Sequence, residues 1–207
     1  MPQLTLFDSS ETPLVDDDRG RIAYMPHIVD AATADRWFAE LRTGVKWRSE
    51  RRVMYDRELD VPRLIGHFRL DTPTASTPRS VLDAARLVGD KLGVPFNSVG
   101  LNLYRDGRDS VAPHNDHLNE IRKGFPIALV SLGAPRRMTI RSKVQPRRTI
   151  HVDLEPGSLL VMDYATQLHY THGVPKTTDP VGERISLAFR VKPARAPADP
   201  DGNGVYR

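Results

Sequence analysis

The sequence predicts a mainly β domain of the α+β class, in which two sheets form a sandwich or jelly roll and two helices pack outside. Beyond Asn97 the chain consists of short runs rich in β-branched and apolar residues, separated by Gly, Pro and charged turns. Before that point, apolar residues recur at helical spacing in two segments. A parallel sheet would need helical segments between the strands, and the second half of the sequence shows no such segment.

Both expected helices have recognisable ends. The first covers residues 30–43, where Asp30 is placed as an N-cap ahead of apolar residues at helical spacing. The second runs from Arg79 to Leu92, after the start signal Thr77-Pro78, and Gly93 ends it. We expect both helices to pack outside the sheets.

Seven strands are expected in the second half of the chain. They cover residues 98–104, 126–132, 137–141, 149–154, 158–163, 169–174 and 185–191. Short strands at such close spacing are typical of an antiparallel sandwich or jelly roll.

Length and composition indicate one globular domain. The chain has 207 residues and a mass of 23.2 kDa, with 39% hydrophobic and 27% charged residues. We expect a flexible arm over residues 1–20, a single domain over 21–192 and a flexible tail over 193–207. The sequence contains no apolar run of the roughly 20 residues that a membrane span needs and no secretory signal, so we expect a soluble cytoplasmic protein. Because there is no cysteine, disulfides and thiolate metal sites are excluded.

Charge is distributed unevenly along the chain. Residues 4–18 contain five acids and no Lys or Arg, whereas residues 121–150 contain eight bases and no acid. A basic stretch of this kind can follow the phosphate backbone of a nucleic acid, although a solvated basic face would have the same composition.

The chemically most informative residues are two histidines and an aspartate. His114 and Asp116 are two residues apart, so in an extended segment both side chains point to the same side. A third ligand has to come from a distant strand, and His169 and His172 are both candidates. Two histidines and one carboxylate leave open positions on a metal, as in non-haem iron(II) oxygenases.

Two arginines, Arg184 and Arg190, follow on the last expected strand. They are six residues apart and therefore share one face of that strand. A buried arginine is costly unless it is paired, and a dicarboxylate ligand would pair it.

Taken together, these elements make the sequence similar to the AlkB-like dioxygenases. The resemblance covers roughly residues 98–191, with weaker similarity at Asp56-Arg57 and Val61-Pro62-Arg63. The matching elements, in family order, are Asn102-Leu103-Tyr104, Gly107, His114 with Asp116, Ser131-Leu132-Gly133, Pro156-Gly157-Ser158-Leu159, His169 with His172, and Arg184 with Arg190.

The resemblance implies a double-stranded β-helix, the jelly roll of this family, and an enzyme that uses Fe(II), 2-oxoglutarate and O2. It assigns the metal to His114, Asp116 and His172, because the spacing to Arg184 places His169 in a supporting position. It assigns 2-oxoglutarate to a second set of side chains, namely Asn102, Tyr104, Arg184, Ser186 and Arg190. Ser186 departs from the family, in which Asn is frequent at this position, and Arg190 is also expected to steady Asp116.

The implied reaction is oxidative demethylation of N-alkylated bases in DNA, such as 1-methyladenine and 3-methylcytosine, with release of formaldehyde. A methylated base would stack against His114, and Arg63 would contact the base or a phosphate. Phe68, Tyr55 and Trp47 are the candidates for the other side of the stack, although the core is the usual place for such aromatics.

Two alternatives remain open at this point. The chain departs from DNA-repair members after the metal motif, where it reads His117-Leu118-Asn119-Glu120, and the aromatic-rich substrate flap of the family is not recognisable in the sequence. A 2-oxoglutarate-dependent hydroxylase or demethylase of RNA, a protein or a small molecule therefore remains possible on sequence grounds. So does a β module that binds nucleic acid without catalysis, although the complete ligand set argues against it.

A short peptide near the N-terminus suggests a partner. The five residues Gln3, Leu4, Thr5, Leu6 and Phe7 resemble the pentapeptide by which bacterial repair proteins bind the sliding clamp. An extended peptide could place Leu6 and Phe7 in an apolar pocket while Gln3 forms hydrogen bonds. An edge strand packed on the domain would fit the same residues.

Overall fold

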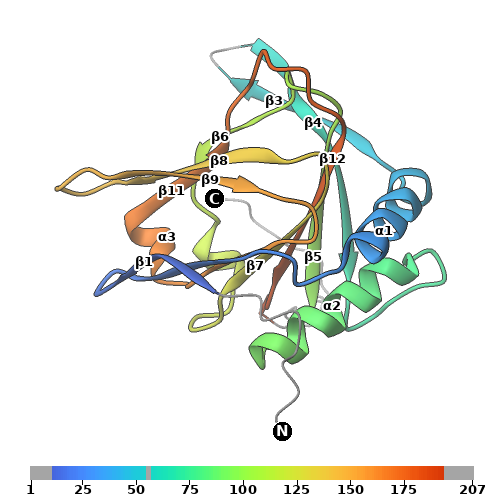
Figure 1. Ribbon diagram of the computed structural model, residues 1–207, viewed down its shortest axis with the longest axis horizontal. Coiled ribbons are helices and arrows are strands. Elements are labelled where there is room, and N and C mark those ends of the chain that lie inside the picture. Colours follow the sequence, from blue (N-terminus) through green and yellow to red (C-terminus); the bar gives the residue numbers. More distant parts are fainter. Residues whose placement is uncertain (1–10, 55–56, 194–207) are drawn as a thin grey trace, which may run out of the picture.

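The structure, a computed structural model, describes residues 11–54 and 57–193, with the backbone alone over 50–54 and 57–60. Its strands form two antiparallel sheets that face each other (Figure 1). The larger sheet contains, in spatial order, β1 (Thr12–Asp17), β2 (Gly20–Met25), β10 (Leu159–Met162), β7 (Ile127–Gly133), β12 (Arg184–Arg190), β5 (Ser98–Tyr104), β4 (Arg57–Arg69) and β3 (Arg48–Met54). The smaller sheet contains β6 (Val111–His114), β11 (Tyr170–Val174), β8 (Arg136–Ser142) and β9 (Thr149–Leu154).

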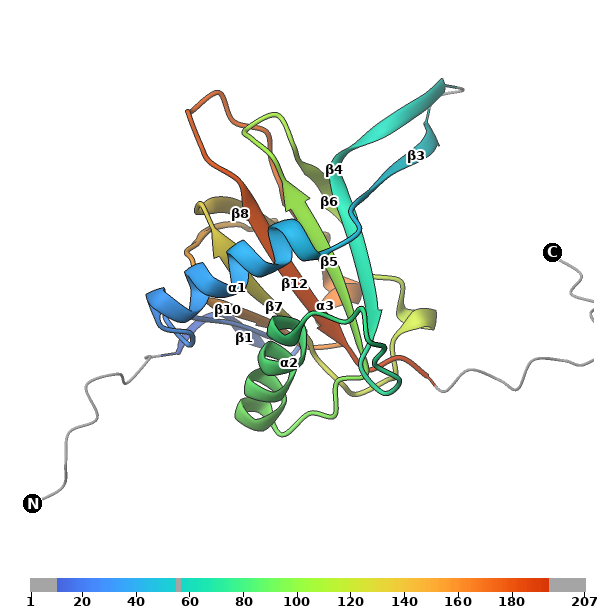
Figure 2. The ribbon, with the colours of Figure 1, turned by 90° about the vertical axis from the view of Figure 1, so that its right-hand side faces the viewer.

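Two helices cover the outer face of the larger sheet. These are α1 (Ala31–Gly44) and α2 (Arg79–Leu92), which lie side by side over that face in Figure 2. Asp30 caps α1 by accepting a hydrogen bond from the Thr33 main-chain N–H at 2.9 Å, and Gly93 ends α2 in the left-handed conformation at φ 64°. None of the helices in the described part of the chain is long and apolar enough to cross a membrane.

Strict alternation along β12 separates the core from the site. Ile185, Leu187 and Phe189 are fully buried under the helices, in a core that also includes Trp37 and Leu41 of α1. The alternate residues of β12 point to the inner face, between the two sheets. A second apolar core, which includes Tyr104, Leu129, Ile140, Leu154 and Ala188, fills part of that space.

The predicted fold class is confirmed: the domain is a mainly β jelly roll with two helices packed outside. Each of the seven expected strands is present, with ends within one residue of those expected. The helix expected over 30–43 covers 31–44, and the one expected over 79–92 is found there. Two small elements that were not expected are η1 (Leu118–Glu120) and α3 (Thr166–His169).

The expected arm over residues 1–20 is wrong from residue 12 onward, because β1 is the edge strand of the larger sheet. Val15 of β1 and Ile22 of β2 are 2% and 1% exposed, and burial of these side chains holds the pair on the domain. The acids of β1 point to solvent and dominate its composition, which concealed the strand. Residues 1–10 and 194–207 lie outside the described part.

The β3–β4 hairpin was not expected either. It extends the larger sheet and projects beyond the body of the domain in Figure 2. Pro62 interrupts the β pattern of this region, but Pro62 has no N–H to pair and its carbonyl accepts a hydrogen bond from the Ser110 N–H at 2.8 Å. Strand β4 pairs with β5 and thereby borders the inner face.

Candidate active site

Three side chains that are distant in sequence meet on the inner side of the smaller sheet. His114 at the end of β6 lies directly opposite His172 of β11 in the antiparallel register, with ring centroids 4.4 Å apart. Asp116 follows two residues after His114. One ligand atom from each of these residues lies within 4.8 Å of the other two, an arrangement that could hold a metal ion.

Both histidines can present an unprotonated ring nitrogen to a metal ion. The Nδ1–H of His114 donates to the Ala112 carbonyl at 3.0 Å, which leaves Nε2 unprotonated when the ring is neutral. Burial lowers the pKa of His172 to about 4. Its imidazole is therefore neutral near pH 7, the form that binds a metal.

Asp116 is held from two directions. Its carboxylate accepts hydrogen bonds from Arg190 Nη2 at 2.9 Å and Nε at 3.1 Å, and its main-chain N–H donates to Gln167 Oε1 at 3.1 Å. Burial raises the pKa of the Asp116 carboxyl, but the charge and hydrogen bonds of Arg190, together with the neighbouring histidines, outweigh this effect and the pKa lies below its usual value. The carboxylate thus stays ionised.

The segment between the ligands is fixed from outside the site. Asn115 points away from the two ligands, where it donates to the Tyr170 carbonyl and accepts from Lys143 Nζ at 3.1 Å. Lys143 Nζ also donates to the Gln167 carbonyl at 3.1 Å. Gln167 and Lys143 were not expected at the site. Strand alternation predicts that Asn115 faces away from the ligands, but not which residues it contacts.

The expected 2-oxoglutarate ligands lie on one face of β5 and β12. Asn102 is opposite Ser186 and Tyr104 is opposite Arg184 in the register, and Asn102 Nδ2 donates to Ser186 Oγ at 3.4 Å. Arg63 reaches this face from β4 and its Nε donates to Asn102 Oδ1 at 2.7 Å.

The surroundings of Arg184 indicate whether this face can bind an anionic ligand. The side chain is 0% exposed, and Nη2 donates to Ser131 Oγ at 2.9 Å. Within the described residues, Nε and Nη1 have no hydrogen-bond partner. A buried guanidinium with two unpaired nitrogens is costly, and a carboxylate placed beside it would satisfy both. The residues present therefore fit 2-oxoglutarate, as the three ligands fit iron.

Some expected residues are elsewhere. Phe68 belongs to the other face of β4, where it packs against the core beneath the helices, and it is replaced on the inner face by His67. Trp47 packs against the same core and its Nε1 donates to the Arg42 carbonyl. The expected stacking role of Phe68 is therefore wrong. Tyr55 and the peptide Gln3, Leu4, Leu6 and Phe7 lie outside the described residues.

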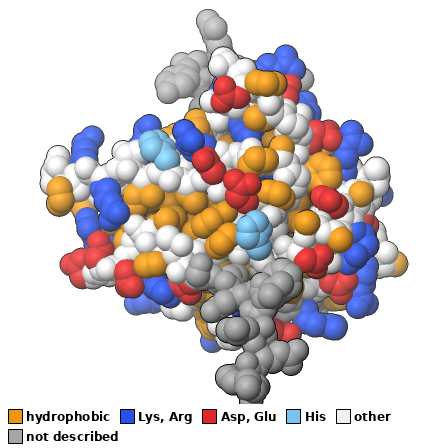
Figure 3. All heavy atoms as spheres, in the orientation of Figure 1, with side chains coloured by type: hydrophobic (Ala, Val, Ile, Leu, Met, Phe, Trp, Pro, Cys, Tyr) orange, Lys and Arg blue, Asp and Glu red, His pale blue; other side chains and the backbone are white. Residues whose placement is uncertain are grey.

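The basic stretch 121–150 does not form a uniform surface. Arg136 is 3% exposed, and Arg137 forms an ion pair with Asp153 at 2.9 Å. The exposed cations that remain include Arg141, Arg147 and Arg148 in and beside the β8–β9 loop. Figure 3 shows Lys and Arg side chains around the left edge of the molecule, where this hairpin projects in Figure 1.

Comparison with known proteins identifies the family. A profile of the 2OG-Fe(II) oxygenase superfamily matches residues 21–190. DNA oxidative demethylase ALKBH2 of Bos taurus is 38% identical over 180 residues, which cover 77% of this chain and 64% of that protein. Alpha-ketoglutarate-dependent dioxygenase alkB homolog 3 of Bos taurus is 30% identical over 187 residues, which cover 82% and 65%. The match thus spans slightly less than two thirds of each relative's length.

Solved structures agree on the fold. OsALKBH1 has a TM-score of 0.56 at 15% identity, covering 87% of this chain and all of that chain. The non-heme alpha-ketoglutarate-dependent epimerase SnoN has a TM-score of 0.58 at 15% identity, covering 84% and 79%. Because the profile spans the domain from β2 to β12 and these sequence relatives are AlkB homologues, the chain belongs to the 2OG-Fe(II) oxygenase superfamily as an AlkB-like member.

Proposed function

We propose that this chain is an Fe(II)- and 2-oxoglutarate-dependent dioxygenase that oxidatively demethylates N-alkylated bases in DNA. The observation that carries the proposal is the buried guanidinium of Arg184, with two unpaired nitrogens, on the inner face of the larger sheet, opposite the smaller sheet that carries the candidate metal ligands. The names of the relatives, a DNA oxidative demethylase and an alpha-ketoglutarate-dependent dioxygenase, support this activity and substrate.

The protein side chains position the metal, the 2-oxo acid and the substrate relative to one another. Bound iron and 2-oxoglutarate supply the oxidation of a C–H bond by O2, with conversion of the 2-oxo acid to succinate and carbon dioxide. His114, Asp116 and His172 would hold the metal. Asn102, Tyr104, Ser186 and Arg184 orient the 2-oxo acid along β5 and β12, while Arg190 keeps Asp116 in position. Loss of formaldehyde from the hydroxylated N-methyl group, with the hydroxyl proton passing to the base nitrogen, would leave the unmodified base.

Access for a nucleic acid comes from the rim of the site. His114 is exposed, whereas His172 beneath it is buried, so a base turned out of its stack would meet His114 first. The exposed Arg side chains at the β8–β9 turn can bind phosphates, Arg141 from strand β8 and Arg147 and Arg148 from the loop, and Lys143 Nζ donates a hydrogen bond to Asn115 between the metal ligands. These contacts favour a polyanionic substrate over a small molecule.

The direct test is formaldehyde release from oligonucleotides. We expect the iron-loaded protein with 2-oxoglutarate to release formaldehyde from 1-methyladenine and 3-methylcytosine in single- or double-stranded DNA. Asp116→Ala should abolish it, because that variant lacks one of the three metal ligands.

Other outcomes would identify the alternatives. Turnover of methylated RNA but not DNA, or succinate production with neither nucleic acid demethylated, would replace DNA by another substrate. If no succinate formed under any condition while oligonucleotides still bound, the chain would be a non-catalytic nucleic-acid-binding module.

We also propose that residues 3–7 bind a bacterial sliding clamp. The support is the sequence Gln3-Leu4-Thr5-Leu6-Phe7, which precedes the described residues. Wild-type protein should be retained on immobilised purified clamp, and the double variant Leu6→Ala/Phe7→Ala should be lost. Equal retention of both would refute the partner without affecting the proposed chemistry.

A further inference from the structure

Arg136, at the start of β8, is a second buried arginine near the cofactor face. It is 3% exposed and donates hydrogen bonds to three main-chain carbonyls, those of Asp106 and Asp109 at 2.9 Å and of Pro175 at 2.8 Å. Among the described residues it forms no ion pair with a carboxylate. Its hydrogen bonds thus go to neutral groups, and although burial lowers the pKa of Arg136, a guanidinium remains protonated near pH 7.

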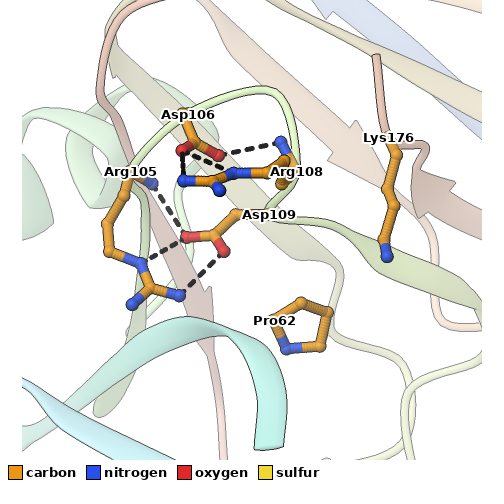
Figure 4. Close-up of a pocket in the computed structure, with 6 residues that line it drawn as sticks. All are labelled: Pro62, Arg105, Asp106, Arg108, Asp109 and Lys176. Atoms are coloured by element: carbon orange, nitrogen blue, oxygen red, sulfur yellow. Dashed lines mark hydrogen bonds and ion pairs between the residues drawn. The ribbon is translucent and has the colours of Figure 1, made fainter. Parts of the chain in front are cut away.

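The nearest acids are already neutralised by other arginines. Figure 4 shows Asp109 paired with Arg105 and Asp106 paired with Arg108, at 2.8 Å and 2.7 Å. These four residues line a pocket of about 330 Å³ together with Pro62 and Lys176. Because each acid has its own partner, the charge of Arg136 behind this pocket is only partly balanced.

Tyr104 connects this charge to the cofactor face. The guanidinium carbon of Arg136 lies 5.6 Å from the centroid of the Tyr104 ring, and that of Arg184 lies 5.0 Å from it. The two carbons are therefore at most about 11 Å apart, the sum of these distances. Burial lowers the pKa of Arg184, and the positive charge of Arg136 lowers it further. Two cations thus act on one buried region.

The position of Arg184 shows which end of a ligand it would meet. Arg190 contacts the metal ligand Asp116, and Arg184 lies six residues away along β12. A 2-oxo acid whose oxo end is held at the metal would therefore present its far carboxylate to Arg184. A ligand without that carboxylate would leave both arginines uncompensated.

We propose that Arg136 is a positioning residue that selects 2-oxo dicarboxylates over monocarboxylates by its charge, without touching the ligand. The proposal rests on the proposed use of 2-oxoglutarate. At an effective dielectric constant of about 20, a unit charge roughly 10 Å from a carboxylate changes a binding constant by about tenfold. The effect on a ligand lacking the far carboxylate should be much smaller.

The test separates this charge effect from the role of Arg136 as a link between two loops. Binding of 2-oxoglutarate and of 2-oxopentanoate, which lacks the far carboxylate, is measured anaerobically by calorimetry on the Mn²⁺-loaded full-length protein. Arg136→Gln keeps a hydrogen-bond donor without the charge, and Arg136→Lys keeps the charge with fewer donors. Lys176→Met removes an exposed cation that lines the same pocket. Melting temperatures of the metal-free variants show whether each is folded.

We expect Arg136→Gln to lower the affinity for 2-oxoglutarate about tenfold and the affinity for 2-oxopentanoate less than threefold. For Arg136→Lys and Lys176→Met, both affinities should stay within about threefold of the wild-type values. Bound 2-oxoglutarate should also raise the melting temperature of Arg136→Gln less than that of wild type. Equal weakening of both ligands, or Arg136→Lys as weak as Arg136→Gln, would overturn the proposal and leave Arg136 a purely structural link. If wild type bound no 2-oxoglutarate, the proposed function itself would fail.

Discussion

Arg190 and Asp116 form a bidentate ion pair at the metal end of the site. Nη2 of Arg190 lies 2.9 Å from both carboxylate oxygens, and the two side chains are 21% and 10% exposed. The arginine expected from the resemblance to contact 2-oxoglutarate is thus engaged first with a metal ligand. Planar two-pronged pairs fix orientation as well as charge, so Arg190 determines which Asp116 lone pair can face a metal.

Arg190→Met should weaken metal binding by about ten- to a hundredfold, because Asp116 would lose its orienting partner and be left buried without a cation. Anaerobic titration with Co²⁺, followed by visible absorption, measures the change. The matched control is Arg137→Met, which breaks an ion pair to Asp153 with both side chains more than half exposed. Equal metal affinity in Arg190→Met and wild type would show that Asp116 needs no such support.

Arg184→Met should stabilise the metal-free fold and abolish 2-oxoglutarate binding. Two nitrogens of this fully buried guanidinium lack a partner among the described residues, so the metal-free fold carries an uncompensated desolvation cost. An apolar side chain of similar length should raise the unfolding free energy by about 1 kcal/mol or more while 2-oxoglutarate binding falls below detection. Urea unfolding of the metal-free protein and calorimetry measure the two effects. Destabilisation of the variant would mean that Arg184 is satisfied without a ligand.

The metal-free protein should lose stability as the pH falls below about 6.5, the ordinary pKa of histidine. Burial holds the pKa of His172 at about 4 in the folded protein, so the fold favours the neutral ring. The stabilisation is therefore complete above pH 6.5 and decreases as the pH falls toward 4, by up to about 3 kcal/mol. Urea unfolding at several pH values, compared with His172→Gln, measures it. A wild-type profile parallel to that of the variant would exclude this contribution.

Much of the fold and of the candidate site follows from local sequence. The alternation in Arg184–Arg190 and the two-residue spacing of His114 and Asp116 each state which side chains share a face, and strand period alone determines this. Asp30 and Gly93 likewise mark helix ends because capping depends on local backbone geometry.

Contacts between distant segments could not be derived in this way. Gln167 on Asp116, Lys143 on Asn115 and Arg136 beside Tyr104 depend on how loops from different sheets meet. Arg136 was counted with the basic stretch, and only the packing shows that it is buried. Strand β1 was missed because its acids conceal a single buried Val15.

Phe68 lies on the opposite face of β4 from the site because of the two-residue period of the strand. Adjacent residues of a strand face opposite sides of the sheet, so the residue of β4 on the inner face is His67 and not its aromatic neighbour Phe68. His67 lies opposite Gly100 of β5, and its Nε2 is 3.0 Å from Ser98 Oγ. Burial is the main cause that lowers the pKa of His67, and the positive charges of Lys192, Arg69 and Arg190 lower it further.

Phe68→Ala should therefore destabilise the fold by about 2 kcal/mol, since it removes a partly buried ring from the helix-side core, and leave the affinity for methylated DNA unchanged. His67→Ala should change stability by no more than about 0.5 kcal/mol and weaken the affinity for methylated DNA, because it alters the face that the substrate meets. Urea unfolding and fluorescence-anisotropy titration of a 3-methylcytosine oligonucleotide, with Mn²⁺ and 2-oxoglutarate present, measure the two effects for each variant. The reverse pattern, a stable Phe68→Ala that binds the oligonucleotide poorly, would return the stacking role to Phe68 and contradict the register of β4 with β5.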